Sequence, residues 1–173
     1  MNNMRLVYVE KVTLNIGVGS PGDKLDKAMK LLKNISGLKS VSTMSTKRIP
    51  TWGVRPKLPI ACKVTVRGKK AGELLKRLLS AVDNYVPARK FDKFGNFSFG
   101  IQEYIDIPDV PYDASIGIIG LEAAVTLNRK GYRIKRRALL KRKIPLRHSI
   151  TSDQAREFIN NVFNTKTEAE EWL

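Results

Sequence analysis

Three stretches of this chain alternate apolar and polar side chains with a period of two, and this alternation restricts the fold more than any other feature. The stretches lie within residues 12–16, 60–67 and 96–102. Because successive side chains of a strand point to opposite faces, each stretch predicts a strand with one apolar and one polar face. A parallel sheet covered on both faces would read as continuous apolar runs instead. The pattern therefore predicts a largely antiparallel sheet with helices packed on one side only.

Other segments have the spacing of amphipathic helices or of further strands. We expect helices over 23–35, 71–82 and about 152–164, and strands over 12–16, 39–45, 60–67, 96–102 and 122–128. The last helix starts at a capping box formed by Thr151 and Gln154. The predicted fold class is α+β, with a sheet of about five strands that has helices on one face and leaves the other face open. A chain of 173 residues suits one domain, residues 1–173.

The charge of the chain indicates a polyanionic partner. Lys and Arg number 32 against 16 Asp and Glu, which gives a net charge of +16 and a pI near 10.1. This excess is far above what solubility requires, while the 42% hydrophobic content is that of a folding chain. No run of residues approaches the roughly 20 apolar residues of a membrane helix, and no signal peptide is recognisable. We expect a cytoplasmic protein with no membrane partner.

The polar face of the predicted sheet is a candidate surface for nucleic acid. Its residues are Lys11, Thr13, Asn15, Lys63, Thr65, Arg67, Asn96 and Ser98. Alternation alone is equally compatible with plain solvated surface, which is its commonest meaning. The net charge favours an RNA or DNA surface.

A glycine-rich stretch near the N-terminus raises the alternative of a nucleotide-dependent enzyme. Gly17, Gly19 and Gly22 have the spacing of a dinucleotide-binding turn. However, residues 27–72 contain no carboxylate for a ribose, and the fingerprint needs a parallel strand-helix-strand unit. Asp23 stands where a phosphate-binding loop needs Lys. We interpret the glycines as a turn between strand and helix, and expect no cofactor.

Other residues with catalytic or metal-binding chemistry are sparse. His148 is the only histidine and lies in a basic run, so phosphate contact or plain surface fits it better than catalysis. Asp106, Asp109 and Asp113 could serve a magnesium-dependent nuclease, but Asp beside Pro is also typical of turns. The single cysteine, Cys62, is expected to be a small buried side chain in a reducing compartment. The sequence predicts neither an enzyme nor a metal site.

The densest basic segment covers residues 129–148, where ten of twenty residues are Lys or Arg and none is acidic. We predict that it lies over the fold as a basic extension and contacts the phosphates of a nucleic acid. The apolar residues expected to anchor it are Tyr132, Ile134, Leu139, Leu140 and Ile144. The predicted phosphate contacts are Arg129, Lys130, Arg133, Lys135, Arg136, Arg137, Lys141, Arg142 and Lys143. A nuclear-localisation-like or membrane-surface stretch is the alternative.

A second basic segment, residues 45–59, reads as an exposed loop between two strands. It contains Lys47, Arg48, Trp52, Arg55 and Lys57 and no carboxylate. An aromatic ring among cations can engage RNA by stacking and phosphate contact. Trp52 could equally be a core residue.

With these residues identified, the chain resembles the large-subunit ribosomal protein five family, over nearly its whole length. The resemblance rests on "KVTLNIGVG", "GVRPKLPIACKVTVRG", "FGNFSFGI" and "IPDVPYD". Each motif is weak alone, but together they are specific. "KGYRIKRR" and "SITSDQAREFI" are similar to the archaeal and eukaryotic branch and differ from the shorter bacterial ending.

The resemblance implies a structural protein of the ribosome in the cytoplasm. It implies that the open sheet face binds 5S ribosomal RNA and attaches it to the large subunit in the central protuberance. It also implies that the 45–59 loop contacts P-site transfer RNA, that large-subunit ribosomal RNA and neighbouring ribosomal proteins are further partners, and that a small-subunit head protein is contacted across an intersubunit bridge. Another basic nucleic-acid-binding module is the alternative function.

Overall fold

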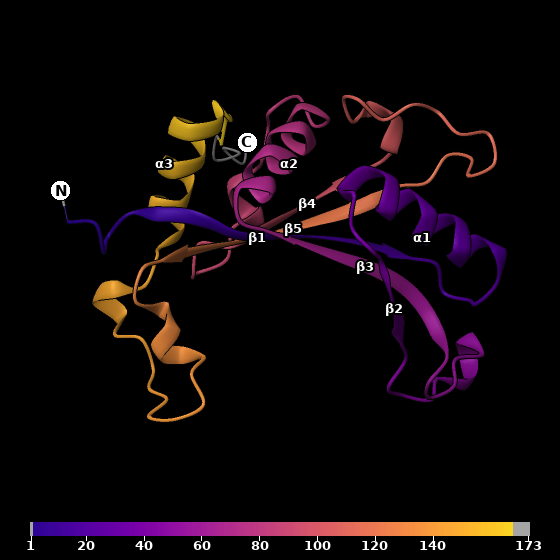
Figure 1. The fold of residues 1–173 in the computed structure, drawn as a ribbon, viewed down its shortest axis with the longest axis horizontal. Coiled ribbons are helices and arrows are strands. Elements are labelled where there is room, and N and C mark those ends of the chain that lie inside the picture. Colours follow the sequence, from indigo (N-terminus) through magenta and orange to yellow (C-terminus); the bar gives the residue numbers. More distant parts are fainter. Residues whose placement is uncertain (1, 168–173) are drawn as a thin grey trace, which may run out of the picture.

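The alternating segments pair into a five-stranded antiparallel sheet in the computed structural model, which describes residues 2–167 (Figure 1). The strand order is β2-β3-β1-β5-β4. The strands are β1 (Val7–Gly17), β2 (Val41–Met44), β3 (Pro59–Arg67), β4 (Phe97–Ile101) and β5 (Leu121–Arg129). The predicted fold class and all five strands are confirmed. The acidic C-terminal tail lies outside the described residues from position 168 onward.

The register of β1 with β3 separates apolar from polar side chains. Three apolar pairs face one side, namely Val12 with Val66, Leu14 with Val64 and Ile16 with Cys62. The residues between them pair on the other side, as Lys11 with Arg67, Thr13 with Thr65 and Asn15 with Lys63. Because apolar residues pair with apolar residues and polar residues with polar residues across the two strands, one sheet face is buried and the other stays polar.

All three helices lie on the apolar side of the sheet (Figure 1). They are α1 (Asp23–Ser36), α2 (Lys69–Ser80) and α3 (Ser152–Phe163). Their buried side chains, such as Leu32 of α1, Leu75 of α2 and Ile159 of α3, join one hydrophobic cluster with the inward side chains of the strands. Burial of this apolar area is the main free energy holding helices to sheet. The three predicted helices are therefore confirmed.

The boundaries of two elements differ from the sequence expectation. α2 runs from Lys69 to Ser80 and ends early because the next residues turn, with Asp83 and Asn84 in the left-handed region. β1 begins at Val7, five residues before the predicted strand. A bulge at Glu10 shifts the pairing with β5, so the period of two is broken there and the first half of β1 does not read as the same strand.

The basic extension leaves the end of β5 and lies on the open side of the sheet (Figure 1). It contains two 3₁₀ turns, Tyr132–Lys135 and Leu146–His148. Tyr132, Ile134 and Ile144 are half-buried, as expected of anchors. The prediction for Leu139 and Leu140 was wrong, because these side chains are 82% and 76% exposed at the outer end of the segment, beyond the reach of the core.

A glycine before β4 tests how α3 is seated. Gly95 has φ +77°, and a Cβ there would come within 2.6 Å of Ile150 Cγ2 and 3.0 Å of Ala155 Cβ. Gly95→Ala combines backbone strain with a clash, so we expect the free energy of unfolding in urea to fall by about 3 kcal/mol.

Gly19→Ala is the matched control, because Gly19 has φ +84° but a Cβ at this position would have nothing within 4 Å. It should lose only about 1 kcal/mol from backbone strain. Equal losses in the two variants would contradict the tight seating of α3 against the turn that enters β4.

Candidate nucleic-acid interface

The middle of the open face forms a shallow hollow of about 500 Å³. Four residues predicted for RNA binding line it, namely Thr13, Asn15, Lys63 and Ser98. Lys11, Thr65 and Arg67 continue the same face along the β1–β3 ladder. Asn96 lies apart from this group, because it lines a second hollow beneath the basic extension. The structure thus brings seven of the eight predicted side chains onto one face of the sheet.

Two carboxylates share the open face and were not singled out from the sequence. Asn15 Nδ2 donates a hydrogen bond of 2.9 Å to Glu122 Oε2 on β5. Glu10 lies at the β1 bulge, and its side chain is only 10% exposed. The irregular alternation before Val12 is the one sequence signal of a special position at Glu10.

Glu10 joins the sheet to the basic extension. Its Oε1 accepts a hydrogen bond from Arg67 Nη1 at 3.3 Å, and its Oε2 accepts one from Asn128 Nδ2 at 2.9 Å. Arg136 of the extension donates to the same Oε2. Charge-assisted hydrogen bonds of this kind are stronger than neutral ones, and a mostly buried carboxylate needs them. Glu10 therefore fixes where the extension lies relative to β3 and β5.

The base of the extension is closed by polar contacts. Arg129 is buried; its Nη2 donates to Gln154 Oε1 at 2.9 Å, and its Nη1 lies 3.4 Å from the carbonyl oxygens of His148 and Ser149. This burial argues against the predicted phosphate contact for Arg129. It makes the guanidinium a link between β5 and the cap of α3, because Gln154 also accepts from the Thr151 backbone N–H.

His148 also contributes to these contacts at the base of the extension and is half-buried, so it is not plain surface. Its Nε2 lies 2.9 Å from the Lys130 carbonyl oxygen, and its ring packs edge-on against Tyr132. The Tyr132 hydroxyl donates to the His148 carbonyl at 3.1 Å and accepts from the Ile150 N–H. Burial raises the pKa of Tyr132, so its hydroxyl remains a donor.

The remaining cations of the extension are exposed and surround this closed base. They are Lys130, Arg133, Lys135, Arg136, Arg137, Lys141, Arg142, Lys143 and Arg147. Arg136 is paired with Glu10, and Arg137 Nε donates to the Leu140 carbonyl oxygen at 2.8 Å. Such a group concentrates positive potential beside the open sheet face, which attracts a polyanion.

The 45–59 segment is an ordered arm on the same side of the sheet as the extension (Figure 1). Ile49 and Val54 exchange two backbone hydrogen bonds, and Val54 is buried, so the tip has a fixed shape. Trp52 is 76% exposed, which decides between the two positions left open by the sequence. Lys47, Arg48, Arg55 and Lys57 are exposed around it. Two basic arms therefore flank the open face.

The glycine-rich turn is not a phosphate cradle. The Val18 and Gly19 N–H groups donate to the Ile60 carbonyl oxygen at 3.0 and 2.8 Å, so a ligand would have to displace β3 backbone bonds to reach them. β1 is also antiparallel to both of its neighbours, whereas a dinucleotide site needs parallel strands. The structural interpretation of these glycines is confirmed.

Two of the carboxylates near Pro108 and Pro111, those of Asp113 and Asp109, each contact different partners. Hydrogen bonds from Ser115 and Lys30 lower the pKa of Asp113 to about 2. Asp109 pairs with Arg77 at 3.9 Å. Among residues 2–167, no group of three or more His, Cys, Asp or Glu could hold a metal ion.

Cys62 is buried as predicted, and burial raises the pKa of its thiol to about 11.

Two family models together match most of this chain. Residues 2–55 match the family model "Ribosomal protein L5", and residues 59–146 match the model for the C-terminus of the same ribosomal family. The large ribosomal subunit protein uL5 of Methanosphaera stadtmanae is 45% identical over 97% of this chain and 100% of that protein. Its counterpart from Sulfurisphaera tokodaii is 47% identical over 95% and 93% of the two chains, and that from Nanoarchaeum equitans is 51% identical over 87% and 89%.

The chain belongs to the ribosomal L5 family. Membership makes it a structural constituent of the large ribosomal subunit, a cytoplasmic particle, and not an enzyme. Its partners are accordingly ribosomal RNA and ribosomal proteins. Within the described part of the chain, no helix is both long and apolar enough to span a bilayer.

The link through Glu10 predicts the behaviour of the extension in the free protein. Glu10→Gln removes the charge that Arg67 and Arg136 contact, so the extension should lose about 1 kcal/mol of attachment. Trypsin should then cleave within residues 130–147 roughly fivefold faster than in the parent chain, as measured by mass spectrometry of the fragments.

Glu122→Gln is the control for this experiment, because Glu122 contacts Asn15 at the centre of the face and lies outside the pocket that the extension covers. Its cleavage rate should equal that of the parent chain. An unchanged rate in Glu10→Gln would show that Glu10 does not hold the extension.

Proposed function

We propose that the open sheet face binds 5S ribosomal RNA and attaches it to the large subunit in the central protuberance. The observation that carries the proposal is the cross-strand pairing of Lys11 with Arg67 and Asn15 with Lys63 on a face that no helix covers. A row of cations and hydrogen-bonding groups at strand spacing suits a folded RNA, whose phosphates and 2′-hydroxyls line a wide groove. The likeness of the chain to large-subunit proteins supports this partner.

The two arms extend the surface to different RNA partners in this proposal. The extension supplies phosphate contacts to large-subunit ribosomal RNA through its exposed lysines and arginines. The 45–59 arm projects away from the sheet with Trp52 at its tip and contacts P-site transfer RNA by stacking and phosphate contact. Because the arms lie at opposite ends of the sheet (Figure 1), one molecule can reach both partners.

The helical side of the molecule offers a surface of a different kind, which we assign to the small-subunit head protein. The loop between β4 and β5 exposes Ile105, Tyr112 and Ile118, together with Asp106 and Asp109. The carboxylates repel RNA phosphates, whereas apolar groups beside carboxylates suit a basic protein partner. This loop lies on the helical side, away from the two basic arms (Figure 1).

A double variant tests the open face. Lys63→Ala with Arg67→Ala should weaken 5S ribosomal RNA binding by about 1 to 3 kcal/mol in a filter-binding assay, with a melting temperature near that of the parent because both side chains are exposed. The parent chain should show a log-log salt slope on the order of minus 3 to minus 6, and the double variant a shallower one.

Lys27→Ala with Lys76→Ala removes the same charge from exposed positions of α1 and α2 and should leave the affinity nearly unchanged. Lys63→Ala alone should show a measurable part of the loss in 5S affinity. This single variant is needed because Arg67 also contacts Glu10. Equal affinity of all variants would contradict the assignment of the open face to 5S ribosomal RNA. Equal competition by duplex DNA at matched salt would favour a general nucleic-acid-binding module.

A triple variant separates the two RNA partners. Arg48→Ala, Trp52→Ala and Arg55→Ala together should leave binding to isolated 5S ribosomal RNA almost normal. In reassembled ribosomes, P-site transfer RNA retention should weaken by about 1 to 2 kcal/mol, because two cations and one stacking ring are lost. Weakened 5S binding with normal transfer RNA retention would show that the arm contacts 5S ribosomal RNA and not transfer RNA.

A further inference from the structure

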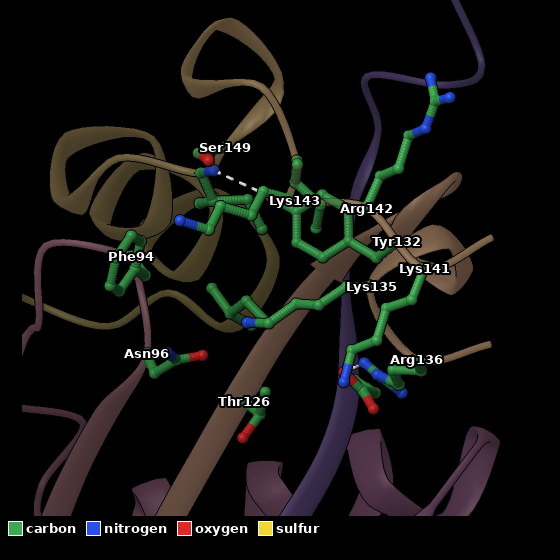
Figure 2. A pocket seen from close by; sticks show the side chains of 14 residues that line it. Phe94, Asn96, Thr126, Tyr132, Lys135, Arg136, Lys141, Arg142, Lys143 and Ser149 are labelled. Carbon is green, nitrogen blue, oxygen red and sulfur yellow. Dashed lines mark hydrogen bonds and ion pairs between the residues drawn. The ribbon is translucent and has the colours of Figure 1, made fainter. Parts of the chain in front are cut away.

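A second hollow, of about 540 Å³, lies between the extension and the open face (Figure 2). It is separate from the central hollow and shares no lining residue with it. Its walls come from β1, β5, the turn before β4 and the extension, so the folded extension creates it. The volume is in the range of pockets that hold small ligands, and it is ample for one nucleotide.

The rim of the hollow is cationic. Lys135, Lys141 and Lys143 all line it from the extension. Lys135 crosses the opening toward Asn96, and Lys141 lies beside Arg136 on the opposite wall (Figure 2). The Glu10 carboxylate at this wall is already engaged by Arg67, Asn128 and Arg136. The lysines therefore remain able to hold a phosphate at the mouth.

The inner surface of the hollow is apolar and has one exposed aromatic ring. Leu127, Ile144 and Ile150 line the interior. Phe94 lines one side and is 52% exposed, and Lys93 Nζ lies 5.4 Å from the centroid of its ring. A nucleobase stacked on such a ring gains free energy whatever its identity. The hollow thus pairs a stacking platform with a phosphate rim.

Asn96 supplies a hydrogen-bonding group whose orientation is fixed. Its Nδ2 donates to Asp92 Oδ2 at 2.8 Å, and a carboxylate can only accept, so the amide nitrogen must face Asp92. The Asn96 oxygen points into the hollow (Figure 2). Asp92 is itself held, since its Oδ1 accepts from the backbone N–H groups of Phe94 and Asn96 at 2.8 and 2.7 Å. The pocket therefore presents a preorganised acceptor beside the aromatic ring.

We propose that this hollow holds one unstacked nucleotide of ribosomal RNA whose base carries an exocyclic amine. The base stacks on Phe94 and donates its amine hydrogen to the Asn96 oxygen, while the lysine rim holds the phosphate. Uracil is disfavoured, because its only ring donor lies between two carbonyl oxygens that would face the Asn96 oxygen and the Asp92 carboxylate. This inference rests on the proposed binding of ribosomal RNA and adds base selectivity to it.

The test is an NMR titration of the ¹⁵N-labelled full chain with CMP and with UMP. The two nucleotides have equal charge and nearly equal stacking surface, so non-specific attraction to a basic protein cancels between them. CMP should shift the amide signals of Phe94, Asn96 and Tyr132 and bind about fivefold more tightly than UMP. Inorganic phosphate should shift signals of the lysine rim without those of Phe94 and the Asn96 side chain.

Two variants decide between selectivity and general attraction. Asn96→Ala should lower the affinity for CMP to that for UMP. The turn is retained in this variant, because Asp92 keeps its two hydrogen bonds from backbone N–H groups. Phe94→Ala should weaken both nucleotides severalfold and keep their ratio. Trp52→Ala removes an exposed ring from the other arm and should change neither the CMP nor the UMP affinity.

Equal affinities of CMP and UMP in the parent chain, or an unchanged ratio in Asn96→Ala, would overturn the inference. So would shifts that avoid the hollow. Binding of 5S ribosomal RNA to the parent chain is measured in parallel. If that binding is intact while the nucleotides show no selectivity, only the pocket assignment fails; if that binding is absent, the proposed function fails as well.

Discussion

The pairing of β1 with both β3 and β5 is the constraint on which the rest of the molecule depends. Its register sets Leu14 against Val64 and Ala123 on the buried side and Asn15 against Lys63 and Glu122 on the open side. A shift by one residue would exchange the two faces, burying lysines and exposing the core. The helices can therefore cover only one face, and the other face is left as a polar surface on which RNA can lie.

One acidic residue organises the basic part of this surface. Glu10 occupies the β1 bulge and holds arginines from β3 and from the extension. Without it, like charges on the sheet and on the extension would repel each other, and the hollow beneath the extension would have no fixed wall. The positively charged surface thus has a defined shape, with a central hollow, a nucleotide-sized pocket and two arms.

Period-two alternation predicted the sheet, its open face and most of the residues proposed to face RNA, because that pattern depends only on local backbone geometry. The family resemblance, carried by motifs such as "KVTLNIGVG", was confirmed by comparison. What the sequence did not reveal depends on contacts between distant segments. Arg129 reads as one more cation but is buried against the cap of α3, Leu139 reads as an anchor but is exposed, and the partners of Glu10 lie at positions 67, 128 and 136.

Lysine reactivity tests most directly whether RNA lies on the open face between the arms. Acetylation of each lysine is measured by mass spectrometry in the free chain and in its complex with 5S ribosomal RNA. Lys11, Lys63 and the extension lysines should be protected severalfold in the complex, while Lys24, Lys27, Lys33 and Lys76 on the outer sides of α1 and α2 keep their reactivity. Protection of the helix lysines with unchanged reactivity of Lys11 and Lys63 would contradict the account.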